Sequence, residues 1–344
     1  MIANFNSEVV IGNGILKTYI SDQSSSNFVL ITTKTPYKLF RKYFKDANYA
    51  KIIIKSNDIS EINAVADSFR PRKFQRVIAF GSGTTIDFAK ALSSKIGGYL
   101  VAIPTILSCN AFATNKSVVR SNSKLVSITS KTPDKVIIDL DIIKLSQERY
   151  NFAGVADVLS IFTALFDWNL AVQSKMEDKN QLIENISQSL LESMMQRSSE
   201  IFTKRDVALK KLAQMLLISG YVTNLYGSGR PESGSEHMFA RAIEESGRYY
   251  KKMLHGEAVL LGILLCSELQ CQKNDYFYDI ATRINLLTVL QGIRMDQKQI
   301  ETYLLKASKI RRDRFTIFNK INLSQKMANT IVTKVLSKLK KWKI

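Results

Sequence analysis

Five short, continuously apolar stretches in the first 140 residues constrain the fold of this chain more than any other feature. Polar segments with a helical pattern, such as 36–44 and 59–69, separate these stretches; the stretches are 28–32 (FVLIT), 51–54 (KIII), 77–80 (VIAF), 100–103 (LVAI) and 136–138 (VII). Strands buried on both faces of a parallel sheet have this composition, because helices cover both sides of such a sheet. The alternation predicts an α/β domain of the dinucleotide-binding type.

After residue 145 the pattern changes to long helical segments, and signals for strands almost vanish. The segments are 155–173, 182–202, 206–226, 235–245 and 255–270. A chain of 344 residues is also longer than one hydrophobic core usually serves. We therefore expect two domains, a parallel-sheet dinucleotide-binding α/β domain over residues 1–145 and an all-α domain over residues 146–344.

The composition is that of an ordinary globular protein, with 45% hydrophobic and 23% charged residues. No apolar run approaches the roughly 18 residues that a membrane-spanning helix needs, and the first residues do not have the pattern of a secretory signal. The three cysteines, Cys109, Cys266 and Cys271, are odd in number and lack the CxxC spacing of a metal site. They predict reduced thiols in a cytoplasmic protein.

The net charge of +19 is concentrated at the C-terminal end, where residues 306–344 contain twelve Lys or Arg and one acid, Asp313. Four apolar residues recur there at near-helical spacing: Ile331, Val335, Leu339 and Trp342. We expect a terminal helix that docks on the domain and exposes a basic face. Attachment to an anionic membrane surface is the second interpretation. Contact with nucleic acid is not expected, because no base-reading motif accompanies the charge.

A glycine-containing turn, Gly81-Ser-Gly-Thr-Thr-Ile-Asp87, directly follows the VIAF stretch and opens a helical segment that runs through Lys90. Glycines at such a turn let a phosphate approach backbone amides, and the helix N-terminus favours its negative charge. The spacing is not GxGxxG, so two interpretations stay open at this point. The turn is either a phosphate site for a nucleotide or a simple tight turn.

The chain contains only two histidines, and each lies at the start of a predicted helix. His237 ends the segment GRPESGSEH, and His255 begins the segment HGE. Two neutral imidazoles and one carboxylate suit zinc, or else iron or nickel, with a position left for substrate. Asp157, in an apolar segment that we take as a helix start, is a candidate third ligand, because a carboxylate there is costly unless paired or metal-bound. From the residue alone, a satisfied core Asp or a helix cap is an equal alternative.

Several motifs together resemble the superfamily of iron-containing alcohol dehydrogenases, glycerol dehydrogenases and dehydroquinate synthases, and within it the glycerol-1-phosphate dehydrogenases. The resemblance runs nearly end to end, through FGSGTTIDFAK, IPTILS, PDKVIID, AGVAD, GSGRPESGSEH, LHGEAV and DRFTIF. It implies that Asp157, His237 and His255 hold the metal and act in catalysis. It also implies a set of nicotinamide-nucleotide contacts, namely Gly81, Ser82, Gly83, Thr84, Thr85, Asp87, Thr105, Ser108 and Thr114.

The reaction implied by the resemblance is metal-assisted hydride transfer between NAD or NADP and a small phosphorylated substrate. The expected enzyme, which we take to be a homo-oligomer, reduces dihydroxyacetone phosphate, or a similar phosphorylated ketone, to sn-glycerol 1-phosphate with zinc as the metal. The stretch 28–32 leads into Thr33 and Lys34, where an acidic residue would favour NAD. Its absence leaves NADP open as well.

Two residues that we expect to contact substrate with Asp157 depart from the family pattern. Asn110 stands where the resemblance implies Asp, and Arg241 stands where it implies His. Asn can still bond a hydroxyl group but cannot act as an anionic acceptor or base, unless the change is simply neutral. Arg241, four residues after His237 on the same helix face, suits a phosphate or carboxylate, or else a surface ion pair with Glu244 or Glu245.

Two other enzyme classes remain as alternatives. One is a cyclase (a lyase) similar to dehydroquinate synthase, which would act on a sugar phosphate and use NAD only transiently. The other is a dehydrogenase of a different polyol. The lysine-rich substrate motif of the cyclases is not evident, so the dehydrogenase is the expected function.

Overall fold

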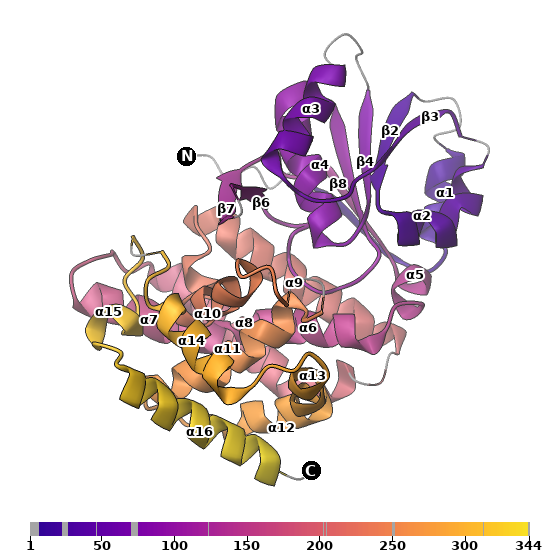
Figure 1. The fold of residues 1–344 in the computed structure, drawn as a ribbon. Helices are drawn as coiled ribbons and strands as arrows, with labels where there is room; N and C mark the ends of the chain where they lie inside the picture. The colour runs from indigo at the N-terminus through magenta and orange to yellow at the C-terminus, as the bar shows by residue number, and fades with distance from the viewer. Residues whose placement is uncertain are drawn as a thin grey trace. The chain divides into compact units, whose positions relative to one another are not determined.

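The structure is a computed structural model that describes residues 7–22, 27–45, 47–69, 75–122, 124–201, 203, 205–249, 252–311 and 313–342. The chain divides into two compact units (Figure 1). The first comprises Met1–Asn151 and Ser199–Asn224, and the second comprises Phe152–Ser198 and Leu225–Ile344. The division at residues 145 and 146 from the sequence stays a prediction, and it differs from these units in treating each domain as one continuous stretch.

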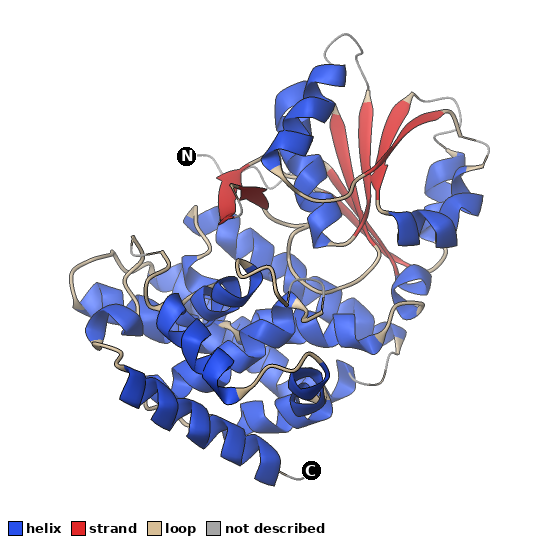
Figure 2. Ribbon diagram, viewed as in Figure 1, coloured by secondary structure: helices blue, strands red, loops and turns tan. Residues whose placement is uncertain are grey.

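A six-stranded, fully parallel sheet forms the centre of the first unit (Figure 2). Its strand order is β1-β8-β5-β4-β2-β3. The strands are β1 (Glu8–Gly12), β2 (Phe28–Thr32), β3 (Tyr49–Ile53), β4 (Arg76–Gly81), β5 (Tyr99–Pro104) and β8 (Lys135–Asp139). The five apolar stretches of the sequence are thus confirmed as strands, and β1 is an additional edge strand.

Helices cover both faces of this sheet, which explains why its inner strands β2, β4, β5 and β8 are apolar and buried along most of their length. The helices of the first unit are α1 (Ile15–Ser21), α2 (Lys34–Phe40), the 3-10 helix η1 (Arg41–Phe44), α3 (Ile59–Phe69), α4 (Gly83–Ile96), α5 (Leu140–Lys144) and α9 (Asp206–Tyr226). On one face Leu16, Phe44 and Phe80 belong to a single buried cluster, and on the other α3 and α4 pack together. A separate antiparallel hairpin consists of β6 (Lys116–Ser121) and β7 (Lys124–Thr129).

The second unit is helical, as the sequence predicts. Its helices are α6 (Glu148–Leu159), α7 (Ile161–Gln173), α8 (Gln181–Ile201), η2 (Arg230–Glu232), α10 (Ser235–Glu244), α11 (His255–Leu269), α12 (Asp275–Arg283), α13 (Leu286–Gly292), α14 (Gln297–Ala307), α15 (Ile317–Lys320) and α16 (Gln325–Lys341). The predicted helical segment 155–173 is helical but begins earlier, and it is divided at Ser160 into α6 and α7. The hydroxyl of Ser160 donates to the carbonyl oxygen of Glu232 at 2.6 Å. Asp157 therefore lies near the end of α6 and not at the start of a helix.

The stretch Glu148–Gln173 is long and apolar enough to cross a membrane by length and composition, which the sequence analysis did not detect. Two thirds of its apolar window, 67%, is buried inside the structure. A core helix of a soluble protein has this burial, and we interpret the stretch in that way.

The basic C-terminal segment forms α16, and its apolar side is covered by the second unit. Val332, Val335 and Leu339 are buried, and α16 packs against α11, α12 and α14. Two of its lysines, Lys334 and Lys338, form ion pairs with Glu268. The expected docked helix is therefore what the structure contains.

Candidate active site

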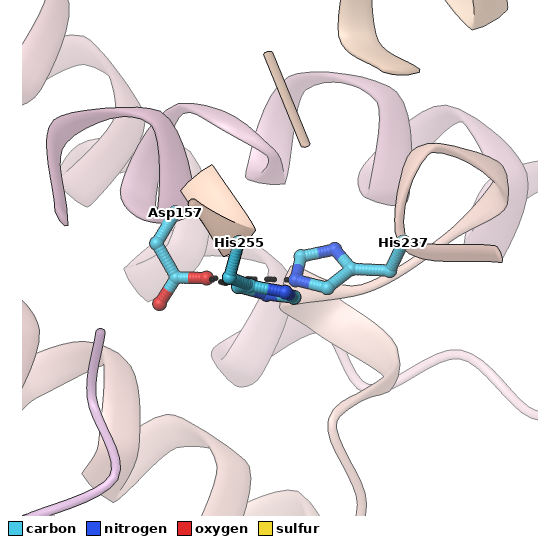
Figure 3. Close-up of side chains that lie close together, drawn as sticks. All are labelled: Asp157, His237 and His255. Carbon is cyan, nitrogen blue, oxygen red and sulfur yellow. Dashed lines mark ion pairs between the residues drawn. The ribbon is translucent and has the colours of Figure 1, made fainter. Parts of the chain in front are cut away.

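Asp157, His237 and His255 come together from three different helices of the second unit (Figure 3). Asp157 lies on α6, His237 on α10, and His255 is the first residue of α11. Oδ1 of Asp157 lies 3.5 Å from Nε2 of His237 and 3.7 Å from Nε2 of His255. One ligand atom from each of the three lies within 4.8 Å of the other two. The three candidate metal ligands predicted from the sequence thus converge on one point.

Two glycines of α11 allow the three helices to approach this closely. A Cβ at Gly256 would overlap the backbone of Ala153, which lies one turn before Asp157 on α6. A Cβ at Gly262 would lie 2.6 Å from the carbonyl oxygen of Glu236 on α10. A side chain at either position would meet backbone atoms that cannot move aside, so these glycines set the spacing of the site.

The second ring nitrogen of each histidine faces a glutamate. Nδ1 of His237 lies 2.8 Å from Oε1 of Glu236, and Nδ1 of His255 lies 2.8 Å from Oε1 of Glu244. Burial lowers the pKa of His237, but the hydrogen bonds with Asp157 and Glu236 outweigh it and raise the pKa to about 9. For His255, burial is likewise outweighed by the charge of Glu244, which raises the pKa above its usual value. Neither glutamate was predicted from the sequence, although Glu236 directly precedes a candidate ligand.

The segment RPESGSEH owes its shape to buried polar contacts that the sequence alone did not reveal. The Arg230 guanidinium is buried, pairs with Glu177 at 2.9 Å, and donates to the carbonyl oxygen of Asp167 at 3.0 Å. The Asp167 carboxylate accepts from the amides of Ser235 at 2.6 Å and Ile317 at 2.8 Å. Burial, followed by the charge of Glu236, raises the pKa of Asp167 to about 6. These contacts hold the segment before α10 in place and thereby position His237.

The donor set fits a divalent transition metal. Two imidazole nitrogens and one carboxylate oxygen meet at a single point, which is the set that zinc, iron or nickel accepts with a coordination position left for substrate. The side chains of Asp157 and His237 are 9% and 18% exposed, and that of His255 is 38% exposed. The site is therefore partly buried, and the imidazole of His255 is its most exposed member.

The candidate nucleotide contacts lie in the first unit, at the carboxyl ends of its central strands. After β2 the chain continues to β3 on one side, and after β4 it continues to β5 on the other, although β2 and β4 are paired directly. Ligands of open α/β sheets bind at such a switch point. There Gly81 ends β4, and Ser82 precedes α4 without a side-chain cap on the first amides. Thr105 lies beside this turn, since its amide donates to the carbonyl oxygen of Gly81 at 3.0 Å.

Close packing explains the small residues of this turn. A Cβ at Gly81 would overlap Oγ1 of Thr85, and a Cβ at Gly83 would lie 2.7 Å from Sγ of Cys109. Gly83 and Thr84 begin α4 and are partly exposed, as is Ser108 in the loop after β5. Thr85 is buried, so it supports the turn from beneath.

Asp87 and Thr114, also predicted as nucleotide contacts, surround the buried ammonium group of Lys90. Nζ of Lys90 lies 2.9 Å from Oδ1 of Asp87 and donates to the carbonyl oxygens of Ala111 at 2.8 Å and Lys116 at 2.5 Å. It also lies 3.4 Å from Oγ1 of Thr114. Lys90 is fully buried, and its role was not predicted from the sequence. It ties the segment 111–116 to α4.

The two residues that depart from the family pattern lie in different units. Asn110, in the first unit, donates its side-chain amide to Oγ of Ser219 at 2.8 Å. Arg241, in the second, lies on α10 four residues after His237 and is partly buried. Among the described residues it has no hydrogen-bond or ion-pair partner, so the structure does not contain the expected alternative of an ion pair with Glu244 or Glu245. Burial, and then the charge of Arg311, lower the pKa of Arg241.

Known proteins resemble this chain along almost its whole length. Residues 11–146 match the family described as iron-containing alcohol dehydrogenase. Curated relatives named glycerol-1-phosphate dehydrogenase [NAD(P)+] include one from Pyrococcus horikoshii, 30% identical over 80% of both chains, and one from Aeropyrum pernix, 27% identical over 95% of both chains.

Solved structures agree on the fold. A probable glycerol dehydrogenase from Sinorhizobium meliloti has a TM-score of 0.78 at 14% identity and covers 98% of each chain. Glycerol dehydrogenase from Schizosaccharomyces pombe has a TM-score of 0.75 at 16% identity, over 98% of this chain and 90% of its own. The chain therefore belongs to the iron-containing alcohol dehydrogenase family, together with the glycerol-1-phosphate dehydrogenases.

Proposed function

We propose that this protein is a metal-dependent, NAD(P)-linked oxidoreductase that reduces dihydroxyacetone phosphate, or a similar phosphorylated ketone, to sn-glycerol 1-phosphate. The convergence of Asp157, His237 and His255 at one point carries the proposal. The relatives named glycerol-1-phosphate dehydrogenase support the substrate class. The metal is zinc in this proposal, with iron or nickel as alternatives of the same donor set.

The nucleotide would bind at the switch point between β2 and β4. Its diphosphate would meet the uncapped amides at the start of α4, which follows Gly81 and where Ser82, Gly83 and Thr84 are partly exposed. No acidic residue follows β2, where Thr33 and Lys34 stand instead. Such an end of β2 accepts either cofactor, because nothing repels the additional phosphate of NADP.

The residues of the second unit have separable roles in this reaction. A bound metal ion supplies Lewis acidity, which polarises the substrate oxygen. Asp157, His237 and His255 would hold the ion, since Oδ1 of Asp157 and Nε2 of each histidine face the same point. Nicotinamide chemistry provides the hydride, so the protein has to orient the carbonyl carbon toward it and exclude water.

Arg241 is the residue that we assign to the phosphate of the substrate. Its guanidinium is partly buried, has no hydrogen-bond or ion-pair partner among the described residues, and projects from the helix that carries His237. A buried charge without a partner is costly, so binding a phosphate through two hydrogen bonds would stabilise this guanidinium. Asn110 we assign to a substrate hydroxyl, because its amide can donate but cannot serve as a base.

We place the enzyme in the cytoplasm and expect it to act as a homo-oligomer. Cys109, Cys266 and Cys271 do not form disulfide bonds, which suits a reducing compartment. The docked position of α16 makes a membrane unnecessary for covering its apolar side.

A steady-state screen tests the proposed function. Protein reconstituted with zinc, iron or nickel would be mixed with NADH or NADPH and with dihydroxyacetone phosphate or unphosphorylated dihydroxyacetone. We expect the absorbance of the reduced nicotinamide to fall with the phosphorylated ketone and much more slowly with the other. The cyclase alternative predicts turnover of a sugar phosphate without net oxidation of the cofactor. No oxidation with any phosphorylated ketone under all of these conditions would refute the proposal.

A further inference from the structure

We propose that Glu236 and Glu244 are positioning residues that fix both histidines of the metal site in the metal-binding tautomer, and that one helix, α10, thereby sets the geometry of the whole site. The inference rests on the proposed metal function of Asp157, His237 and His255. It concerns residues that themselves touch neither metal nor substrate.

Each imidazole is held between two carboxylates that face its two nitrogens. Nδ1 of His237 lies 2.8 Å from Glu236, and Nδ1 of His255 lies 2.8 Å from Glu244. The Nε2 atoms of both rings face Oδ1 of Asp157. An ionised carboxylate can only accept hydrogen bonds, so a neutral imidazole that offers its Nε2 lone pair to a metal ion keeps its proton on Nδ1, where the glutamate accepts it. Both Nε2 lone pairs are then directed at the same point as the Asp157 oxygen.

Glu236 is built into the structure as an ionised group. Its side chain is fully buried and accepts from the amide of Gly234 at 2.6 Å and from the hydroxyl of Thr163 at 2.7 Å. Together with Nδ1–H of His237, three donors meet its two oxygens. These contacts favour the ionised form, because a carboxylate can accept all three hydrogen bonds and only the hydroxyl of Thr163 could act as an acceptor instead.

Glu244 has the same relationship to its histidine but a more open environment. Its side chain is 22% exposed, and it is the last residue of α10. Glu236 and His237 lie in the first turn of the same helix. The ten residues of α10 therefore supply one candidate ligand, His237, and also the two carboxylates that orient His237 and His255. Outer carboxylates of this kind orient the ring, raise the basicity of the metal-bound nitrogen, and typically contribute 10- to 100-fold in metal affinity.

The variants Glu236→Gln and Glu244→Gln test this inference, because each keeps the size of the side chain and removes its charge. Glu245→Gln is the matched control, since it removes a carboxylate next to Glu244 that does not contact either histidine. The affinity for Zn²⁺ would be measured for the full chain by competition with a chromophoric chelator. The visible absorption of the Co²⁺-loaded protein would report the coordination geometry, which a loss of general stability would not change.

We expect Glu236→Gln and Glu244→Gln to weaken Zn²⁺ binding by about 10- to 100-fold and to change the Co²⁺ spectrum, while Glu245→Gln stays within about twofold of the wild type. Affinities of the first two variants equal to that of the wild type would overturn the inference and leave the proposed function intact. If Glu236→Gln does not fold, Glu244→Gln decides by the same criterion. A wild-type protein that binds neither Zn²⁺ nor Co²⁺ would refute the proposed function itself.

Discussion

Gly262 of α11 lies directly against the backbone of Glu236 in α10. A Cβ at Gly262 would be 2.6 Å from the carbonyl oxygen and 3.0 Å from the Cα of Glu236. Because α11 begins with His255 and α10 carries His237, a side chain here would separate the two helices that hold the candidate ligands. The spacing of the candidate metal site therefore depends on a residue without a side chain.

Gly262→Ala should destabilise the protein by about 1–3 kcal/mol, as overpacking of a core usually does. The matched control is Gly292→Ala, because a Cβ at Gly292 would meet nothing within 4 Å. That change should be neutral or stabilise by about 0.4–1 kcal/mol. Urea unfolding of both variants measures the difference, and equal effects of the two substitutions would contradict the packing argument.

Lys90→Met should cost about 3–5 kcal/mol, because it removes the partner of a largely buried carboxylate, that of Asp87, and leaves several carbonyl oxygens without their donor. Lys211→Met is the control, since Lys211 pairs with Glu200 at a largely exposed position and should contribute no more than about 1 kcal/mol. Denaturant unfolding compares the two variants. If Lys90→Met costs no more than the control, the assigned role of Lys90 is wrong.

Metal binding should release protons at neutral pH. In the metal-free protein burial lowers the pKa of His237, but its hydrogen bonds with Asp157 and Glu236 raise it to about 9. A metal ion binds only the neutral imidazole, so the apparent Zn²⁺ affinity should increase by up to about tenfold per pH unit until pH reaches that value. Titration calorimetry in two buffers of different ionisation enthalpy counts the protons released. If no proton is released on Zn²⁺ binding at pH 7, the proposed coupling between metal binding and deprotonation of His237 is wrong.

The same shift makes the stability of the metal-free protein depend on pH. The pKa of His237 in the folded state lies above the value of about 6.5 expected for the unfolded chain. Its contribution is therefore fully present below pH of about 6.5 and is lost as the pH rises through about 9. Thermal unfolding across this range should show the decline in the wild type and a smaller one in His237→Gln. Identical curves for the two proteins would contradict the assignment.

Arg241→Ala should raise KM for a phosphorylated ketone by about 10- to 100-fold, which is the effect of losing one charge-assisted hydrogen-bond pair. It should leave KM for an unphosphorylated ketone almost unchanged. Arg283→Ala serves as the control, because Arg283 forms a partly exposed ion pair with Asp279 within α12. Equal KM values of Arg241→Ala and the wild type for the phosphorylated ketone would show that another residue binds the phosphate.

Much of the fold follows from the sequence because its local patterns are strong. Strands buried on both faces must be apolar throughout, so β2, β4 and β5 were found, and α9 was predicted with the bounds that the structure has. The edge strand β1 and the hairpin of β6 and β7 were missed, since exposed, half-polar strands resemble loops. Local patterns also do not reveal which core a helix joins, as residues 199–224 illustrate.

Some residues of the candidate site could likewise be predicted from the sequence, and others could not. Rarity and the neighbouring motifs identified the two histidines, and Asp157 followed from the resemblance and an apolar surrounding. Glu236, Glu244 and Lys90 were missed because charged residues in helical segments are usually at the surface. Only the structure reveals that Glu236 and Lys90 are fully buried. Their partners come from distant segments of the chain, which no local pattern can indicate.

The number of zinc ions bound per chain, in the wild type and in His237→Ala, tests the central claim most directly. The wild type should bind one zinc ion. His237→Ala should lose it together with ketone reduction, since removal of a ligand must cost more than the roughly 10- to 100-fold that an outer carboxylate contributes. Cys271→Ser, which changes an exposed thiol elsewhere, should bind zinc as the wild type does. A His237→Ala protein that keeps full zinc stoichiometry and activity would contradict the assignment of Asp157, His237 and His255 as the metal site.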